Sequence, residues 1–447
     1  MLAELLNRKK TFSMGGIHPP ENKLSAHVAI EELPLPKAVI IPIYQQIGKP
    51  PKILVERGDT VKVGQILAEH EGFVSANIHS SVSGKVGKIE PVMDSSGYKH
   101  MAINIRVKGD DWVEDIDRTD TLAREITDEP EEIVKKIMNA GVVGQGGAAF
   151  PSHVKLTVPE GKTVDTLIIN GVECEPYLTA DHRVMLERPG EVLVGTQVLM
   201  KALGVEKAII GIEENKGDAI ELLQRMAKDY PGITVEGLKV QYPQGGEKQL
   251  IEALLGRQVP SGGLPADVGA VVHNVGTTYS IYLAVQKNQP LISRVVTVTG
   301  QEIAKPSNLL VRIGTPVNEL LAAAGGVPNG TGKIVSGGPM MGKALNDLSV
   351  PIVKATSGIL VIPEVSAKRS EVYNCLRCGK CIEACPMGLE PLELMLLSKN
   401  HEYEKAKDSD VLDCLECGSC SFVCPSNRPI LDYIRYGKSK VKKELKK

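Results

Sequence analysis

The chain has 447 residues, more than a single hydrophobic core usually organises, so several compact domains are expected. Its formal net charge of -2 at pH 7 argues against a basic surface for nucleic acid, so we expect no nucleic-acid partner. No apolar run is long enough to predict a membrane span, and the N-terminus lacks the pattern of a secretion signal, which predicts a cytoplasmic protein.

Residues 1–35 lack regular periodicity and include a Gly-Gly-Ile-His-Pro-Pro segment that begins at Gly15. The prolines disfavour regular secondary structure, and the glycines permit backbone conformations that other residues avoid. We therefore expect an ordered arm that wraps over a neighbouring domain.

Residues 36–107 contain short β-type runs separated by turns, which predicts a small all-β domain. A Gly-Asp-x-Val-x-x-Gly turn at 58–64, followed by Ser-x-Val-Ser-Gly-x-Val at 80–86, resembles the barrel-sandwich fold of lipoyl and biotinyl carrier domains. Those carriers place a modifiable lysine between the two elements, whereas the matching stretch 71–79 contains none. The resemblance therefore implies a docking or spacing domain.

Residues 129–290 alternate between helical and strand patterns, which predicts a parallel α/β domain. Residues 291–350 return to short strands around one helix, which is expected to end before Gly325 and Gly326. The Arg-Ile-Gly-Thr-Pro-Val segment at 312–317 resembles the β-grasp (SLBB-like) modules of complex I flavin subunits.

Eight of the nine cysteines fall in two copies of the run Cys-x2-Cys-x2-Cys-x3-Cys-Pro, which predicts a helical ferredoxin-type domain at 366–437. In ferredoxins with two 4Fe-4S clusters, three thiolates of each run hold one cluster and the fourth holds the other. One cluster is therefore assigned to Cys375, Cys378, Cys381 and Cys424. The second is assigned to Cys414, Cys417, Cys420 and Cys385. Zinc is the alternative metal, but a zinc site calls for neither the third cysteine nor the proline.

A glycine-rich loop at 141–151 follows an amphipathic helix in the α/β segment, and alone it is as compatible with a simple turn as with a binding site. It is accompanied by Lys155, by Asn-Gly-Val-Glu-Cys-Glu-Pro at 170–176, by Tyr-Pro-Gln-Gly-Gly-Glu at 242–247 and by His-Asn-Val-Gly-Thr at 273–277. In this order the motifs resemble the flavin-binding subunit of respiratory complex I. With the arm and the barrel-sandwich domain in front, the whole chain resembles the C subunit of Rnf electron-transport complexes.

The resemblance implies non-covalent FMN, NAD(H) and two 4Fe-4S clusters as cofactors. It implies cofactor contacts for the loop and for polar side chains after it: Gly144, Gly146, Gly147, Phe150, Lys155, Asn170, Glu173 and Asn274. It also implies that Glu175 and Glu247 are catalytic residues beside the nicotinamide. For an isolated glutamate a solvated position is the simpler alternative, but Glu173 and Glu175 together follow an apolar strand pattern.

Three positions depart from the complex I pattern. Val172, Gly246 and His273 stand where that site has an aspartate, a glutamate and an asparagine, and the departures bear on dinucleotide affinity. His273 is interpreted as a structural polar contact, and Cys174 as a small buried thiol.

The predicted fold class is multidomain α/β plus β: a barrel-sandwich N-terminal domain, a parallel α/β flavin and NADH domain, a β-grasp domain and a two-cluster domain. The resemblance implies a membrane-bound, ion-translocating ferredoxin:NAD+ oxidoreductase with an iron-sulfur partner subunit and integral membrane subunits. It places this chain at the cytoplasmic face of a bacterial or archaeal membrane. Two alternatives stay open, a cobalamin reductase-like protein and a ferredoxin-like scaffold that binds no dinucleotide.

Overall fold

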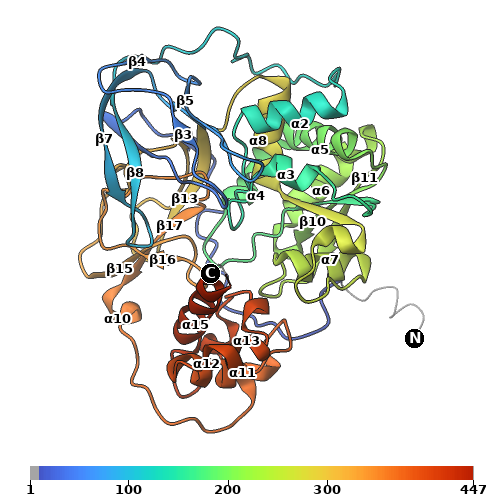
Figure 1. Ribbon diagram of the computed structural model, residues 1–447, viewed down its shortest axis with the longest axis vertical. Coiled ribbons are helices and arrows are strands. Elements are labelled where there is room, and N and C mark those ends of the chain that lie inside the picture. Colours follow the sequence, from blue (N-terminus) through green and yellow to red (C-terminus); the bar gives the residue numbers. More distant parts are fainter. Residues whose placement is uncertain (1–9, 446–447) are drawn as a thin grey trace.

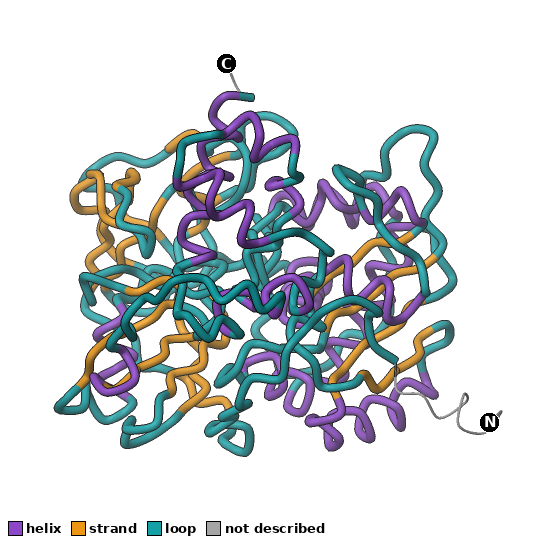
Figure 2. The backbone as a smooth tube through the Cα atoms, turned by 90° about the horizontal axis from the view of Figure 1, so that it is seen from below, coloured by secondary structure: helices purple, strands orange, loops and turns teal. Residues whose placement is uncertain are grey.

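The computed structural model describes residues 10–445. Figure 1 shows the β-rich domains beside a helix-covered α/β domain, with a helical domain below both. Figure 2 shows from below that long loops cross between these parts. Within residues 10–445, none of the helices has the length and apolar character that crossing a bilayer requires.

The N-terminal β domain consists of two small antiparallel sheets that enclose an aliphatic core. One sheet contains β2 (Ala38–Pro42), β4 (Thr60–Val61), β7 (Gly84–Met93) and β8 (Lys99–Val107). The other contains β3 (Lys52–Ile53), β5 (Ile66–Glu69) and β6 (Ile78–His79). Along β8, Ile103 and Ile105 are fully buried while Arg106 is exposed, the alternation that a strand with one face on the core requires.

The α/β domain is built on a four-stranded parallel sheet in the order β11-β10-β9-β12. Its strands are β9 (Thr166–Asn170), β10 (Ala208–Glu213), β11 (Ile233–Leu238) and β12 (Ala270–Asn274). All residues of β10 are buried, because helices cover both faces of the sheet.

The helices of this domain are, in chain order, α2 (Pro130–Asn139), α3 (Ser152–Leu156), α4 (Ala180–Glu187), α5 (Pro189–Leu203), η1 (Glu214–Lys216), α6 (Gly217–Met226), η2 (Ala227–Asp229), α7 (Glu247–Leu255), η3 (Pro265–Val268) and α8 (Val275–Gln286). Strands β9 and β12 pair so that Asn170 lies opposite Asn274 at their carboxyl ends. In open parallel sheets ligands bind at these ends, so the fold itself selects this edge as a site.

The β-grasp domain has a mixed six-stranded sheet in the order β1-β14-β13-β17-β15-β16. Its strands are β1 (Ile30–Glu32), β13 (Ser293–Thr299), β14 (Ser307–Arg312), β15 (Thr331–Ser336), β16 (Lys343–Ala344) and β17 (Gly358–Pro363), with α9 (Val317–Ala323) and α10 (Glu364–Ala367). The sheet extends past residue 350, because β17 lies in its interior. The arm supplies β1 as an edge strand parallel to β14.

The C-terminal domain is helical: α11 (Lys380–Glu383), α12 (Pro391–Lys399), α13 (Tyr403–Asp408), η4 (Val411–Asp413), α14 (Ser419–Phe422) and α15 (Ile430–Glu444). Its core includes Leu394, Met395, Ile430 and Ile434. The short helices α11 and α14 each begin after a left-handed glycine of a cysteine run, Gly379 and Gly418. The two runs therefore adopt the same local conformation.

Candidate active site

A cavity of about 710 Å³, here called the site cavity, includes the carboxyl ends of β9 and β12 in its wall. Its volume falls in the range of small-molecule and cofactor sites. All ten residues expected to contact FMN or the dinucleotide line it: Gly144, Gly146, Gly147, Phe150, Lys155, Asn170, Glu173, Glu175, Glu247 and Asn274. The structure thus gathers into one cavity residues that are dispersed over more than a hundred positions of the sequence.

The glycine-rich loop forms one wall of the site cavity and fits a bound cofactor. Its ends are held by a hydrogen bond from the Gly144 N–H to the Phe150 carbonyl at 2.9 Å. A Cβ added at Gly147 would meet no atom within 4 Å, whereas one at Gly146 would lie 2.9 Å from Asn274 Nδ2. Gly147 therefore leaves open space for a ligand, while Gly146 allows the loop to approach Asn274.

Three of the expected cofactor contacts also hold the cavity wall together. Asn170 Nδ2 donates to the Gly245 carbonyl at 2.9 Å. Asn274 caps α8 by accepting from the Thr277 N–H at 3.1 Å. The Glu173 carboxylate accepts from the Asp181 N–H at 2.8 Å and so caps the start of α4. These side chains fix the loops at the strand ends.

Lys155 and Glu247 form an ion pair in the wall of the site cavity, with Lys155 Nζ 2.6 Å from Glu247 Oε1. The same ammonium donates to the Val272 carbonyl at 3.0 Å. Glu247 is the first residue of α7, where the N-terminal dipole of the helix favours negative charge. A phosphate bound here would interact with the Lys155 ammonium alongside the Glu247 carboxylate.

Glu175 joins the α/β domain to the β-grasp domain. Its carboxylate accepts from the Met341 N–H at 2.7 Å and from the Met340 N–H at 3.2 Å. Burial raises the pKa of Glu175 to about 7, although these two hydrogen bonds act in the opposite direction. The carboxyl can therefore exchange a proton near neutral pH.

Several residues of the cavity wall were not among the sequence predictions. Asp181 accepts from Asn274 Nδ2 at 2.7 Å, and burial together with Glu173 raises its pKa to about 7. Arg294 enters from β13 in the next domain, and Phe73 reaches the cavity from the barrel-sandwich domain. Neither lies in a recognisable motif, so only the packing of the domains could reveal them.

The environment of His273 agrees with a neutral imidazole. Burial lowers the pKa of His273 to about 3, and nearby Lys155 acts in the same direction. Its Nε2 atom lacks a hydrogen-bond partner within residues 10–445. Because His273 lines the site cavity, this buried nitrogen is a polar atom that a ligand would satisfy.

The second cysteine run reaches the same cavity, since Leu415 and Cys417 form part of its wall. The Tyr242 hydroxyl donates to the Cys417 carbonyl at 2.8 Å, which ties this run to the loop before α7. Residues far apart in the sequence thus bring the cysteine domain against the α/β domain.

Seven of the eight cysteines of the runs fall into two groups of neighbouring thiols. Burial raises the pKa of the Cys414, Cys417 and Cys420 thiols, and the neighbouring Cys385 raises it further. These four, here called the inner thiol set, line one small cavity. The Cys381 thiol lies near those of Cys424 and Cys375. These three, together with Cys378, the remaining cysteine of the first run, are here called the outer thiol set. The grouping is the one that crossed ligation requires, while ligation itself stays a prediction.

Backbone amides point at sulfur in both sets, as expected of a site that stabilises charged clusters. The Arg377 N–H donates to Cys375 Sγ at 3.3 Å, and the Glu416 N–H donates to Cys414 Sγ at 3.4 Å. Eight soft thiols in this arrangement fit iron-sulfur chemistry.

Four family models match consecutive parts of the chain. They are the RnfC barrel sandwich hybrid domain at 10–110, the Nuo51 FMN-binding domain at 137–283, the SLBB domain at 295–344 and the 4Fe-4S dicluster domain at 374–428. The predicted fold class is confirmed, and so are FMN and two 4Fe-4S clusters as cofactors.

Curated relatives match almost the whole chain. The C subunit of a proton-translocating ferredoxin:NAD(+) oxidoreductase complex from Clostridium ljungdahlii is 49% identical over 95% of this chain and 93% of its own length. The C subunit of the Na(+)-translocating complex from Acetobacterium woodii is 43% identical over 98% of each chain. The C subunit of an ion-translocating oxidoreductase complex from Rhodobacter capsulatus is 41% identical over 98% of this chain and 85% of its own.

A solved structure shares the fold at low identity. A chain of an NAD+-reducing nickel-iron hydrogenase in the H2-reduced state superposes with a TM-score of 0.50 and 17% identity, covering 72% of this chain and 63% of that one. The fold likeness and the near full-length relatives agree. The chain therefore belongs to the family of C subunits of the ion-translocating ferredoxin:NAD(+) oxidoreductase (Rnf) complexes.

Proposed function

We propose that this chain exchanges a hydride between NAD(H) and FMN, and single electrons between FMN and two 4Fe-4S clusters, within an ion-translocating ferredoxin:NAD+ oxidoreductase complex. One observation carries the proposal: a single cavity is lined by the glycine-rich loop and by Cys417 of the inner thiol set. A flavin site and a cluster site that share a wall can exchange electrons without a further carrier.

FMN supplies, when bound, the conversion between a hydride and single electrons. We assign its cradle to Gly144, Gly146 and Gly147, whose missing side chains let backbone amides approach, and to the Lys155 ammonium. Asn170, Glu173 and Asn274 hold the loops that shape the cradle, which is supported by their hydrogen bonds to neighbouring backbone and side-chain groups. Phe150 offers an aromatic face at the same wall.

We assign Glu175 and Glu247 to the reacting end of the site. The pKa of Glu175 near 7 suits a carboxyl that holds or releases a proton at neutral pH. Glu247 partly neutralises Lys155, so the ion pair orients both groups beside the dinucleotide. The barrel-sandwich domain contributes the rim through Ile47 and Phe73, in keeping with a docking role.

The two thiol sets differ in exposure, which gives the electron route a direction in space. Cys385, Cys417 and Cys420 are buried next to the α/β domain, whereas Cys375 and Cys378 are exposed. We therefore place the inner cluster beside FMN and the outer cluster at the surface, where an iron-sulfur partner subunit would exchange electrons with it. Integral membrane subunits would carry the ion path, and this chain would lie at the cytoplasmic face of the membrane.

The two alternatives are less well supported. A cobalamin reductase-like protein does not account for residues 10–110, which match the RnfC barrel sandwich hybrid domain. A ferredoxin-like scaffold does not account for the FMN-binding domain match at 137–283.

An anaerobic titration tests the proposal. The purified chain should hold stoichiometric FMN and roughly eight irons, as two four-iron clusters require. NADH should bleach the flavin absorbance, and chemical reduction should give EPR signals from both clusters. If the chain held both clusters but bound no flavin, or if NADH did not reduce its flavin, the ferredoxin-like scaffold would be supported instead.

A further inference from the structure

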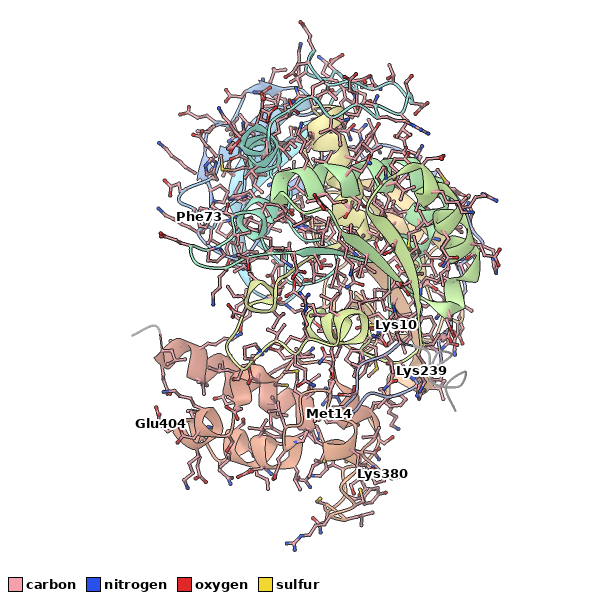
Figure 3. All side chains as sticks on the ribbon, turned by 90° about the vertical axis from the view of Figure 1, so that its right-hand side faces the viewer. Lys10, Met14, Phe73, Lys239, Lys380 and Glu404 are labelled. Atoms are coloured by element: carbon pink, nitrogen blue, oxygen red, sulfur yellow. The ribbon has the colours of Figure 1, made fainter. Side chains whose placement is uncertain are left out.

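The arm at residues 10–35 lies along the boundary between the α/β domain and the cluster domain. Figure 3 shows Lys10 beside Lys239 of the α/β domain, with Met14 lower down, where the cluster domain begins. The Lys239 N–H donates to the Lys10 carbonyl at 3.0 Å. From this anchor the arm runs past both domains before it becomes strand β1.

The arm meets the cluster domain at a ligand position of the inner thiol set. The Gly16 N–H donates to the Ala384 carbonyl at 3.1 Å. Gly15 has φ +70, and a Cβ there would lie 2.5 Å from the carbonyl carbon and oxygen of Cys385. A side chain at position 15 would therefore have to displace the peptide that follows Cys385.

The next residue of the arm meets the loop that borders the site cavity. Ile17 and Tyr242 exchange backbone hydrogen bonds of 2.8 and 2.9 Å, and Gln241 Nε2 donates to the Gly15 carbonyl at 2.8 Å. Ile17, Tyr242, Ala384 and Cys417 form one buried apolar cluster. The arm, the cavity loop and both cysteine runs thus share a small core.

Lys23 holds another part of the wall of the site cavity, the loop that carries Glu173 and Glu175. Its ammonium donates to the carbonyls of Glu173, Glu175 and Leu178 at 2.8, 2.9 and 2.7 Å. A lysine ammonium has three N–H donors, and here each has a carbonyl acceptor in the loop that carries the site carboxylates. The hydrogen-bonding capacity of Lys23 is therefore satisfied by this loop.

We propose that residues 15–23 are a positioning element that fixes the separation between FMN and the inner cluster. This inference rests on the proposed function. Gly15 and Gly16 locate the Cys385 side of the inner thiol set, and Lys23 locates the carboxylate loop. Electron transfer between fixed carriers slows exponentially with their separation, so one rigid segment that contacts both sites controls that step.

The first test compares Gly15→Ala with Gly97→Ala. Gly97 has φ +80 and nothing within 4 Å of an added Cβ, so it matches the backbone strain of position 15 without the contact. The photoreduced chain is mixed with NAD+, and cluster reoxidation is followed separately from flavin reduction by NADH. We expect Gly15→Ala to slow cluster reoxidation ~10-fold or more, or to lose the inner cluster selectively, while NADH still reduces the flavin at the normal rate.

The second test uses Lys23→Met, which keeps an unbranched side chain one heavy atom shorter and removes its donors. It should slow cluster reoxidation by NAD+ several-fold, because the flavin side of the site would no longer be held in place, with both cluster EPR signals unchanged. Lys201→Met is the control, because Lys201 Nζ donates only to the Ile126 carbonyl among the described residues, away from the cavity. This variant keeps the inference testable if Gly15→Ala does not fold.

The rates of cluster reoxidation by NAD+ and of flavin reduction by NADH decide between the possible outcomes. The positioning role would be overturned if Gly15→Ala, with both clusters loaded, reoxidised its clusters at the normal rate. It would also be overturned if Gly97→Ala slowed cluster reoxidation as much as Gly15→Ala, or if Lys23→Met behaved like its control. Failure of the proposed function would look different, since the unmodified chain would then show no NADH-dependent flavin reduction at all.

Discussion

The two cysteine runs have the same spacing but different surroundings. Gly379 and Gly418 occupy equivalent positions with φ of +75 and +84, yet a Cβ at Gly379 would meet nothing within 4 Å and one at Gly418 would lie 3.1 Å from the Met340 carbonyl. Cys378 in the first run is exposed, whereas its counterpart in the second run, Cys417, is buried. Under the proposed electron route, the buried second run would act as an internal relay and the exposed first run as a surface port, so packing would give the same motif two roles.

The largest expected effect separates the two clusters. Cys385→Ala should abolish the inner cluster, because the thiol of Cys385 lies with those of Cys414, Cys417 and Cys420. Iron content should fall by about half, and the outer cluster, reduced chemically, should no longer be reoxidised by NAD+. EPR of the reduced chain measures which signal is lost.

Cys424→Ala is the matched variant in the other run. It should remove the outer cluster and leave the inner cluster able to exchange electrons with NAD+. If each substitution instead removed the cluster of its own run, the crossed assignment would be wrong.

The next effect separates the flavin from both clusters. A Cβ added at Gly147 would meet no atom within 4 Å, so the side chain of Gly147→Val would extend into open cavity space. It should therefore expel FMN while the chain stays folded. Bound flavin should fall ~10-fold or more, since a side chain would replace several polar contacts at once. Gly217→Val is the control, because a Cβ there also meets nothing within 4 Å and lies outside the cavity wall. Normal FMN content in Gly147→Val would show that the loop is only a turn.

A smaller effect tests the comparison of the two runs directly. Gly418→Ala and Gly379→Ala introduce similar left-handed strain, but only the first added methyl approaches the Met340 carbonyl. We expect Gly418→Ala to slow reoxidation by NAD+ about threefold through a displaced inner site, a cost of under 1 kcal/mol. Gly379→Ala should change this rate less. Equal rates in the two variants would mean that the packing of the second run does not matter for electron transfer.

The smallest effect concerns the pH dependence of stability. The folded chain holds the pKa of Glu175 at about 7, above its ordinary value of 4.5, so the folded state binds more protons between these values. Stability should therefore fall as pH rises from about 4.5 to about 7 and then level off. Glu175→Gln should reduce the difference in melting temperature between about pH 5 and about pH 8, by about 2 °C. The control Glu319→Gln, at an exposed position, should leave this difference in melting temperature unchanged. An equal reduction in both variants would exclude a special role for the Glu175 carboxyl.

The cysteine runs and the strand ends could be predicted from the sequence, because spacing and periodicity are local signals. Asn170 and Asn274 each end a strand, and parallel pairing then places them side by side. The approach of Cys417 to the site cavity could not be predicted, since it depends on how two domains pack. Arg294 and the role of Lys23 were missed for the same reason, as both act across domain boundaries.

The most direct test of the central claim is the order in which the two clusters lose electrons. The chain is photoreduced under anaerobic conditions, mixed with NAD+ and freeze-quenched, and the EPR signals of the inner and outer clusters are identified from the Cys385→Ala and Cys424→Ala variants. We predict that the inner cluster is oxidised first and that the outer cluster follows only through it. Outer-cluster oxidation that precedes the inner one, or that persists in Cys385→Ala, would contradict a relay that begins beside the flavin.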